Sequence, residues 1–284
     1  MKERAGPLER AEMRMAALCV APALVIILLV ALVPIAATGW EALHAHDLRL
    51  PWLGRPFIGA GTFVEAAGDP RFREALAHSA AFALVSVPLE LMLGLALAML
   101  MQTVVRGRAL IRVAALLPWA IPTVVAALLW RFMFEAGPVS HWLVHPVLAW
   151  VPIVAADVWK TTPFVAILLL AGLQSIDPVL DEAARIDGAG PIRRFLTVTL
   201  PLLVPALVVA GAFRMLDALR LFDLAYVLTG GGPGTATEPL SLYAFITLMQ
   251  NLRFGYGSAL SITVFLLTFA IALVWVRAMK VRAA

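Results

Sequence analysis

The sequence predicts an all-α membrane protein with six transmembrane helices and both termini in the cytoplasm. Of its 284 residues, 62% are hydrophobic and 14% are charged, and the mean hydropathy is +0.92. Soluble domains contain about 25% charged residues, so a soluble enzyme and a disordered chain are both excluded. The formal charge of +4 is typical of basic side chains that flank membrane helices and does not indicate nucleic-acid binding. The single cysteine, Cys19, excludes an internal disulfide bond.

Six segments are long and apolar enough to cross a membrane, because a helix needs roughly 20 such residues to span about 30 Å of hydrocarbon. They are residues 16–38, 76–102, 110–134, 149–173, 202–226 and 257–277. The first is too long for the apolar core of a signal peptide, and no small-residue cleavage site closes it before Trp40. We therefore divide the chain into an N-terminal segment, 1–15, and a six-helix transmembrane domain, 16–284.

Lysine and arginine are distributed unequally between the loops. If the N-terminus is inside, the loops on its side contain roughly twice as many of these residues as the loops on the other side. The positive-inside rule therefore predicts cytoplasmic termini, three outer loops and two inner loops. The longer inner loop, 174–201, is the most informative stretch of the sequence.

This inner loop has the pattern of two short helices joined by a glycine hinge. Asp177 and Pro178 are typical of a helix start, an N-cap acceptor followed by proline at the first helical position. Gly188 breaks this helix, Pro191 can start a second one, and Pro201 ends the loop and begins the fifth span. The pattern favours a protein-binding knob on the cytoplasmic face. An amphipathic helix lying on the lipid surface is the alternative.

The same loop resembles the EAA loop of ABC importer permeases. The matching residues are Glu182-Ala183-Ala184, Asp187-Gly188-Ala189 and Val198-Thr199-Leu200-Pro201, with Val198 where the family usually has isoleucine. The resemblance implies that the loop is a coupling helix seated in a groove on a cytoplasmic ATPase. It assigns this contact to Glu182, Ala183, Ala184, Asp187, Gly188, Leu200 and Pro201.

Two further stretches resemble the carbohydrate permeases of that family. One comprises Phe222-Asp223, the run 226–234 and Thr237, and the other, 158–164, is similar to members of the trehalose and maltose type. The resemblance implies a type I ABC importer transmembrane domain in a bacterial or archaeal cytoplasmic membrane. It also implies a second homologous permease subunit, two copies of a cytoplasmic ABC ATPase and an extracytoplasmic sugar-binding protein.

The chain has no phosphate-binding loop of the Gly-x-x-x-x-Gly-Lys-Ser/Thr type. We therefore expect a transport subunit that is not itself an enzyme and that holds no cofactor. ATP and Mg²⁺ would be bound by the partner ATPase. No metal site is expected either, because the His141 and His145 pair is better explained as part of an ordinary loop.

Ionisable residues lie inside the predicted spans, where a charge costs about 2.5–3.5 kcal/mol on insertion scales and indicates function by default. Glu90 lies in span two, and Lys160 and Arg214 fall near the middle of spans four and five. A sugar needs hydrogen-bond partners and an aromatic face, so we expect Trp159, Lys160, Thr161, Asp217 and Tyr226 to line its path. Opposite charges at helical spacing also permit intramembrane pairs among Asp157, Arg214, Asp217, Arg220 and Asp223.

Two other transporter classes remain open at this stage. A glycerol-phosphate importer of the same family would be favoured by an excess of arginine or lysine in the cavity. A proton-coupled secondary transporter would use Glu90 and Asp217 as proton carriers, but it would not need an ATPase dock such as the inner loop. A membrane enzyme would need converging catalytic groups near one interface, and the sequence contains none.

Overall fold

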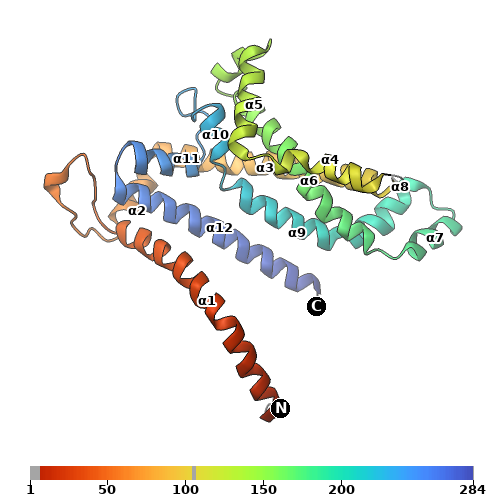
Figure 1. Cartoon of the computed structure of the whole chain (residues 1–284). Helices are drawn as coiled ribbons and strands as arrows, with labels where there is room; N and C mark the ends of the chain where they lie inside the picture. The colour runs from red at the N-terminus through yellow and green to blue at the C-terminus, as the bar shows by residue number, and fades with distance from the viewer. Residues whose placement is uncertain (1–6, 104–106, 284) are drawn as a thin grey trace. The chain divides into compact units, whose positions relative to one another are not determined.

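The computed structural model describes residues 7–103 and 107–283, and these residues form helices joined by short loops (Figure 1). Lys2, Arg4 and Arg106, which contributed to the predicted charge asymmetry, lie outside the described residues. Five helices are long and apolar enough to cross a membrane, and a bent helix pair makes up to six. The predicted all-α membrane class is therefore confirmed, whereas the cytoplasmic location of the termini stays a prediction.

The described residues divide into two compact units. The first contains α1 (Pro7–Glu41), η1 (Pro51–Leu53), most of α2 (Gly61–Gly68) and residues 247–262. Arg253 holds the loop segments of this unit together through an ion pair of 2.5 Å with Glu65. Arg49 donates hydrogen bonds of 2.9 and 2.7 Å to Asp47, and these lower the pKa of that carboxyl to about 2.

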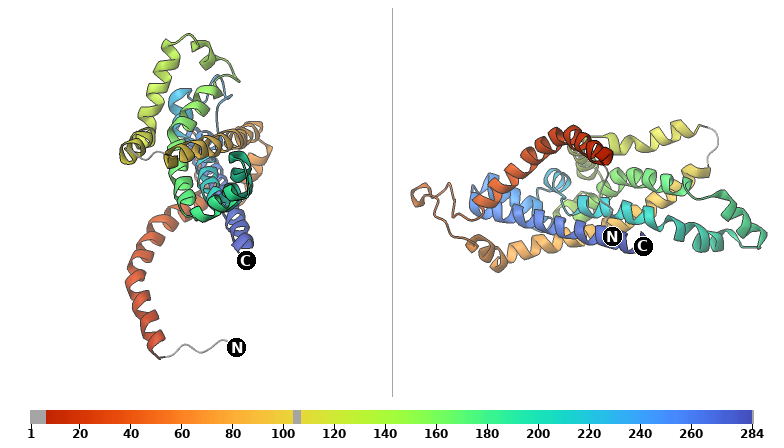
Figure 2. Two further views of the ribbon diagram at one scale, coloured as in Figure 1. Left: turned by 90° about the vertical axis from the view of Figure 1, so that its right-hand side faces the viewer. Right: turned by 90° about the horizontal axis from the view of Figure 1, so that it is seen from below.

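The second unit contains a bundle in which α3, α6 and α9 contact one another pairwise (Figures 1 and 2). The helices of this part of the chain are α3 (Pro70–Thr103), α4 (Arg108–Ala120), α5 (Thr123–Ala136), η2 (Ser140–Val144), α6 (Trp150–Gln174), α7 (Pro178–Ile186), α8 (Pro191–Arg194), η3 (Phe195–Thr199), α9 (Leu200–Ala218), α10 (Asp223–Leu228) and α11 (Leu240–Phe245). The chain continues through η4 (Ile246–Gln250) into α12 (Phe254–Ala283). The bundle positions the candidate site, because the charged residues of that site lie on α3, α6 and α9 or directly after α9.

Glycines allow the helices of the bundle to approach closely. A Cβ atom at Gly94 on α3 would lie 2.5 Å from Cγ1 of Val165 on α6, and one at Gly172 would lie 2.5 Å from Cβ of Ala206 on α9. Membrane helices lack a strong hydrophobic drive to associate, so small residues that let backbones approach are a main source of their packing energy.

The third predicted span, 110–134, is not one straight helix. It is broken into α4 and α5, which are bent by 84° relative to each other. Pro122 favours the break, because it has no N–H to donate to the Pro118 carbonyl and it restricts Ile121 to an extended conformation (φ −70°, ψ 132°). We refer to residues 118–123 as the elbow.

The fifth predicted span, 202–226, differs from the observed one at both ends, because the apolar helix covers Pro191–Ala218. Its helix is continuous with α8, because a π-helical turn, η3, lets the chain pass Pro201 through a hydrogen bond from the Leu200 N–H to the Phe195 carbonyl. The helix then ends at Ala218, and the turn that follows buries Leu221 and Leu224 in the core. Pro201 therefore does not separate the inner loop from the span.

Replacing Gly94 by alanine should destabilise the bundle, because the added methyl overlaps Val165. Overpacking of this kind costs about 1–3 kcal/mol, which outweighs the gain of about 1 kcal/mol in helix propensity. The midpoint of thermal unfolding in detergent should fall. Gly68→Ala is the matched control, since a Cβ atom at Gly68 meets nothing within 4 Å. Equal midpoints for the two variants would contradict the packing argument.

Candidate functional site

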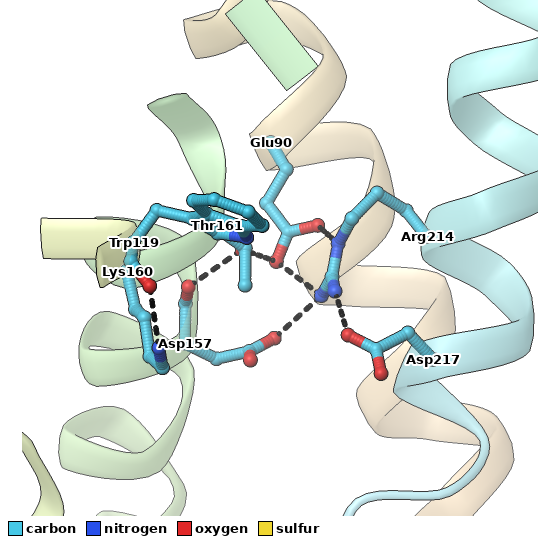
Figure 3. A network of polar contacts seen from close by, with 7 residues as sticks. All are labelled: Glu90, Trp119, Asp157, Lys160, Thr161, Arg214 and Asp217. Carbon is cyan, nitrogen blue, oxygen red and sulfur yellow. Dashed lines mark hydrogen bonds and ion pairs between the residues drawn. The ribbon is translucent and has the colours of Figure 1, made fainter. Parts of the chain in front are cut away.

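Arg214 on α9 lies at the centre of a buried network of charges (Figure 3). Its Nη2 donates to Glu90 Oε1 on α3 at 2.8 Å and to Asp157 Oδ2 on α6 at 2.9 Å, while its Nε also donates to Glu90. Its Nη1 donates to Asp217, one turn further along α9. One guanidinium therefore joins all three helices of the bundle. Its planar fork of donors suits this arrangement, because it can serve several carboxylates at once.

Burial separates the members of this network. Glu90 is 0% exposed and Arg214 is 2% exposed, whereas the side chain of Asp217 is 72% exposed. Thr161 on α6 completes the buried part, since its Oγ1 lies 2.8 Å from Glu90 Oε1 and 2.7 Å from the Asp157 carbonyl. Asp217 is thus the exposed arm of a network that is otherwise buried.

Lys160 has a different kind of partner. Its Nζ donates to the carbonyl oxygen of Trp119 at 3.1 Å (Figure 3) and to that of Ile121 at 2.7 Å, both in the elbow. Among the residues that the structure describes, no carboxylate lies within ion-pair distance of Lys160. Its ammonium therefore hydrogen-bonds to backbone oxygens and forms no ion pair with the carboxylates of the Arg214 network.

A cavity of about 130 Å³ lies beside the network. Its lining consists of Phe82, Thr123, Asp157, Lys160, Thr161, Asp217, Ala218, Arg220, Leu221, Phe222, Asp223 and Leu224. The structure thus brings together Lys160, Thr161 and Asp217 of the predicted substrate path. Hydroxyl, carboxylate and cationic groups converge here, so the cavity can both donate hydrogen bonds to a polar ligand and accept them.

The two predicted aromatic residues of the path do not line this cavity. Trp159 packs edge-to-face against Trp130 on α5, with ring centroids 6.0 Å apart, and Tyr226 stacks on Phe222 at 5.5 Å. The aromatic face of the cavity comes instead from Phe82 and Phe222. Phe82 had no signal in the sequence, because it is one phenylalanine in a long apolar run.

The predicted pairing along span five is correct only in part. Arg214 pairs with Asp157 and Asp217, but Arg220 and Asp223 lie beyond the end of α9 and form no ion pair among the described residues. The reason is the break after Ala218, which removes the regular three-residue spacing. Arg220 and Asp223 line the cavity instead.

The inner loop forms the two short helices that its sequence predicts. Asp177 caps α7 by accepting a hydrogen bond of 3.0 Å from the Val179 N–H, and Gly188 follows with a positive φ of 77°. Asp181 on α7 accepts from Arg194 at 2.7 Å, which ties α7 to α8. The loop therefore has a defined internal structure. The residues predicted to contact the ATPase lie in two places. Those on the first helix and its hinge are Glu182, Ala183, Ala184, Asp187 and Gly188, and those at the start of α9 are Leu200 and Pro201.

The tip of the loop is apolar and exposed. Ile186 at the end of α7 is 86% exposed and Ile192 on α8 is 75% exposed. Glu182 is exposed beside them and has no ion pair among the described residues. A hollow of about 630 Å³ separates the loop from the ends of α3 and α6. The combination of two helices tied by an ion pair and exposed apolar side chains suits contact with another protein.

Comparison with known proteins reveals extensive similarity. A family model described as "Binding-protein-dependent transport system inner membrane component" matches residues 90–282. The trehalose/maltose transport system permease protein MalF of Thermococcus litoralis is 40% identical over 95% of each chain. The sulfoquinovosyl glycerol transport system permease protein SmoG of Agrobacterium fabrum is 37% identical over 94% of this chain and 91% of its own. A bacterial ABC transporter involved in the import of alginate has the same fold, with a TM-score of 0.79 and 21% identity over 95% of this chain and 96% of that chain.

Removing the buried guanidinium of Arg214 should destabilise the protein more than removing an exposed guanidinium does. Arg214→Met leaves Glu90 charged and buried without a cation, which costs about 3–5 kcal/mol. The thermal midpoint in detergent should fall sharply and should recover in part in Arg214→Met/Glu90→Gln, where the stranded charge is gone. Arg131→Met is the matched control, because it removes an exposed pair with Glu135, which contributes about 0.2–1 kcal/mol, and one hydrogen bond of 3.2 Å to the Val227 carbonyl, which contributes about 1 kcal/mol. An Arg214→Met protein as stable as the Arg131→Met control would show that the network does not hold the helices together.

Proposed function

Since the chain belongs to the family of binding-protein-dependent transport system inner membrane components, we propose that it is one permease subunit of an ATP-driven importer. We propose a neutral di- or oligosaccharide as the substrate, with trehalose or maltose as the first candidates. It is a multi-pass protein of the cytoplasmic membrane. The observation that supports the sugar most strongly is the 40% identity, over nearly the whole length of both chains, to a trehalose/maltose permease.

The charges around the cavity also favour a neutral substrate. Three carboxylates, those of Asp157, Asp217 and Asp223, face two cations, those of Lys160 and Arg220. A phosphate would be stabilised by an excess of cations, and such an excess is missing among the described lining residues. Because the Lys160 ammonium already donates to the elbow carbonyls, it also offers little to a phosphate. A glycerol phosphate is therefore the less favoured substrate.

Asp217 is the group best placed to recognise a sugar. Its side chain is exposed, lines the cavity and is held by Arg214. A carboxylate in this position accepts hydrogen bonds from sugar hydroxyls, and hydrogen bonds to charged groups contribute about 1.5–3 kcal/mol each. Thr161 lies deeper in the same cavity, and Phe222 offers an apolar ring face beside it.

The structure gives little support to a proton-coupled carrier. Such a mechanism would need both predicted carriers, Glu90 and Asp217, to exchange protons with the cavity, and of the two only Asp217 is exposed. Glu90 is 0% exposed and its carboxylate is bonded to Arg214 and Thr161, so water does not reach it in this conformation.

The inner loop is the proposed site of energy coupling. It connects the end of α6 directly to the start of α9, and these two helices hold Asp157 and Arg214 of the buried network. A cytoplasmic ATPase that binds ATP and Mg²⁺, present in two copies, would push on this loop and move both helices together. A second homologous permease would complete the translocation path, and an extracytoplasmic sugar-binding protein would deliver the substrate.

Reversing the charge of Glu182 should release the ATPase. When the wild-type chain is isolated from gently solubilised membranes, an ABC ATPase and a second permease should co-purify with it. Glu182→Lys should lose the ATPase and keep the permease, because only the loop contact is altered. Glu74→Lys is the matched control, since Glu74 is also exposed but lies at the opposite end of α3. Absence of any ATPase from the wild-type preparation would contradict the importer assignment.

Removing the exposed carboxylate of the cavity should weaken sugar uptake. Asp217→Ala loses an interaction of about 1.5–3 kcal/mol, so the KM for the sugar should rise roughly 10- to 100-fold. Uptake of labelled trehalose, maltose and glycerol 3-phosphate into vesicles would measure this effect and the substrate preference together. Glu74→Ala is the control and should transport normally. Wild-type uptake by an assembled Asp217→Ala complex would exclude this residue from the path.

A further inference from the structure

The elbow between α4 and α5 leaves backbone carbonyls without helical partners. α4 ends at Ala120, Ile121 is extended, and Pro122 has no N–H to offer to Pro118. In the interior of a membrane each unsatisfied backbone group costs several kcal/mol. A break of this kind therefore persists only where another group supplies the missing donors.

Lys160 supplies these donors. Its Nζ reaches the Trp119 and Ile121 carbonyls on both sides of Ala120 at 3.1 and 2.7 Å. Lys160 is only 9% exposed, so its charge also needs partners. A cation at the C-terminal end of a helix is stabilised by the helix dipole. The buried ammonium and the exposed carbonyls thus satisfy each other.

The neighbours of Lys160 on α6 hold the two arms of the elbow. Phe164 stacks on Trp119 of α4, with ring centroids 5.7 Å apart and an interplanar angle of 15°. Trp159 packs against Trp130 of α5 at 6.0 Å. One face of α6 therefore contacts α4, the break itself and α5. This arrangement accounts for the place of Trp159, which the sequence had suggested for the substrate path.

We propose that Lys160 is a positioning residue that holds the α4–α5 pair in its bent form, and that through the bend it shapes one wall of the substrate cavity. The link to the cavity is Thr123, the first residue of α5, which lines the cavity together with Lys160. If α5 continued straight on from α4, Thr123 would leave this wall. Lys160 then acts on transport through the backbone of the elbow and not by binding sugar.

The role of Lys160 in shaping the cavity rests on the proposed transport function, but its role in holding the bend does not and can be tested separately. The test measures the distance across the elbow in the absence of sugar and ATP. Spin labels would be attached at Leu110→Cys on α4 and Phe132→Cys on α5, both on exposed side chains, in a Cys19→Ser background. From the helical rise, the labelled positions lie about 24 Å apart if the bend is kept and about 33 Å apart in a straight helix.

The doubly labelled parent protein and variants of it would be compared in lipid nanodiscs by pulsed electron paramagnetic resonance. We expect the parent protein and Lys160→Arg to give the short distance. Lys160→Met should move a large part of the population toward the long distance, because the carbonyls lose their donors. Lys160→Met/Pro122→Ala should move more of it, since alanine restores an N–H that lets the helix continue.

The control is Thr162→Val, which alters a neighbouring buried hydroxyl that has no hydrogen-bond partner, and it should keep the short distance. If Lys160→Met does not fold, Pro122→Ala alone gives the answer: the bend should persist, because Lys160 is still present. An unchanged distance in Lys160→Met, or a straight helix in Pro122→Ala, would overturn the proposal. Either result can be read whatever substrate the protein transports.

Discussion

A guanidinium buried among apolar helices must find carboxylates, and most of the bundle is arranged around this need. Arg214 binds Glu90 on α3 and Asp157 on α6, and it lies on α9 itself. No other side chain could do this as well, because the planar fork of arginine serves two carboxylates at fixed angles while a lysine is a point charge. The glycines that let α3, α6 and α9 approach one another are therefore part of the same arrangement, since the ion pairs require short distances between helices.

This arrangement couples the polar centre of the bundle to the inner loop. α6 enters that loop and α9 leaves it, so the two helices that hold Asp157 and Arg214 are joined both at the network and at the loop. A force applied at α7 or α8 would act on both helices together. The ion pair between Asp181 and Arg194 joins the two loop helices across their glycine hinge. The proposed contact with a partner ATPase would therefore reach α6 and α9 through one loop.

The sequence predicts which residues matter more readily than it predicts their partners. Long apolar runs identify the spans, and Asp177 before Pro178 identifies the start of α7, because both signals are local. Glu90 stands out as the one acidic residue of its span, yet its bond to Arg214 crosses 124 positions of the chain and has no local signature. Pro118 and Pro122 favour a bend in span three, but the sequence alone does not predict the 84° break there or the continuous helix through Pro201. Proline has the same local effect in each place, and only the surroundings decide whether the helix breaks or continues through a π turn.

The buried side chains of Arg214 and Lys160 show how the surroundings determine which partners a cation finds. Arg214 is met by carboxylates from neighbouring helices, whereas Lys160 is met by carbonyls that the break between α4 and α5 leaves without helical partners. The ammonium fits this second site because carbonyl oxygens at a helix end converge on a point and need no planar donor. Asp157 and Lys160 lie one turn apart on α6, so any displacement of that helix changes the ion pair and the elbow at once. The cavity lies between these two contacts, and its shape therefore depends on both of them through the position of a single helix.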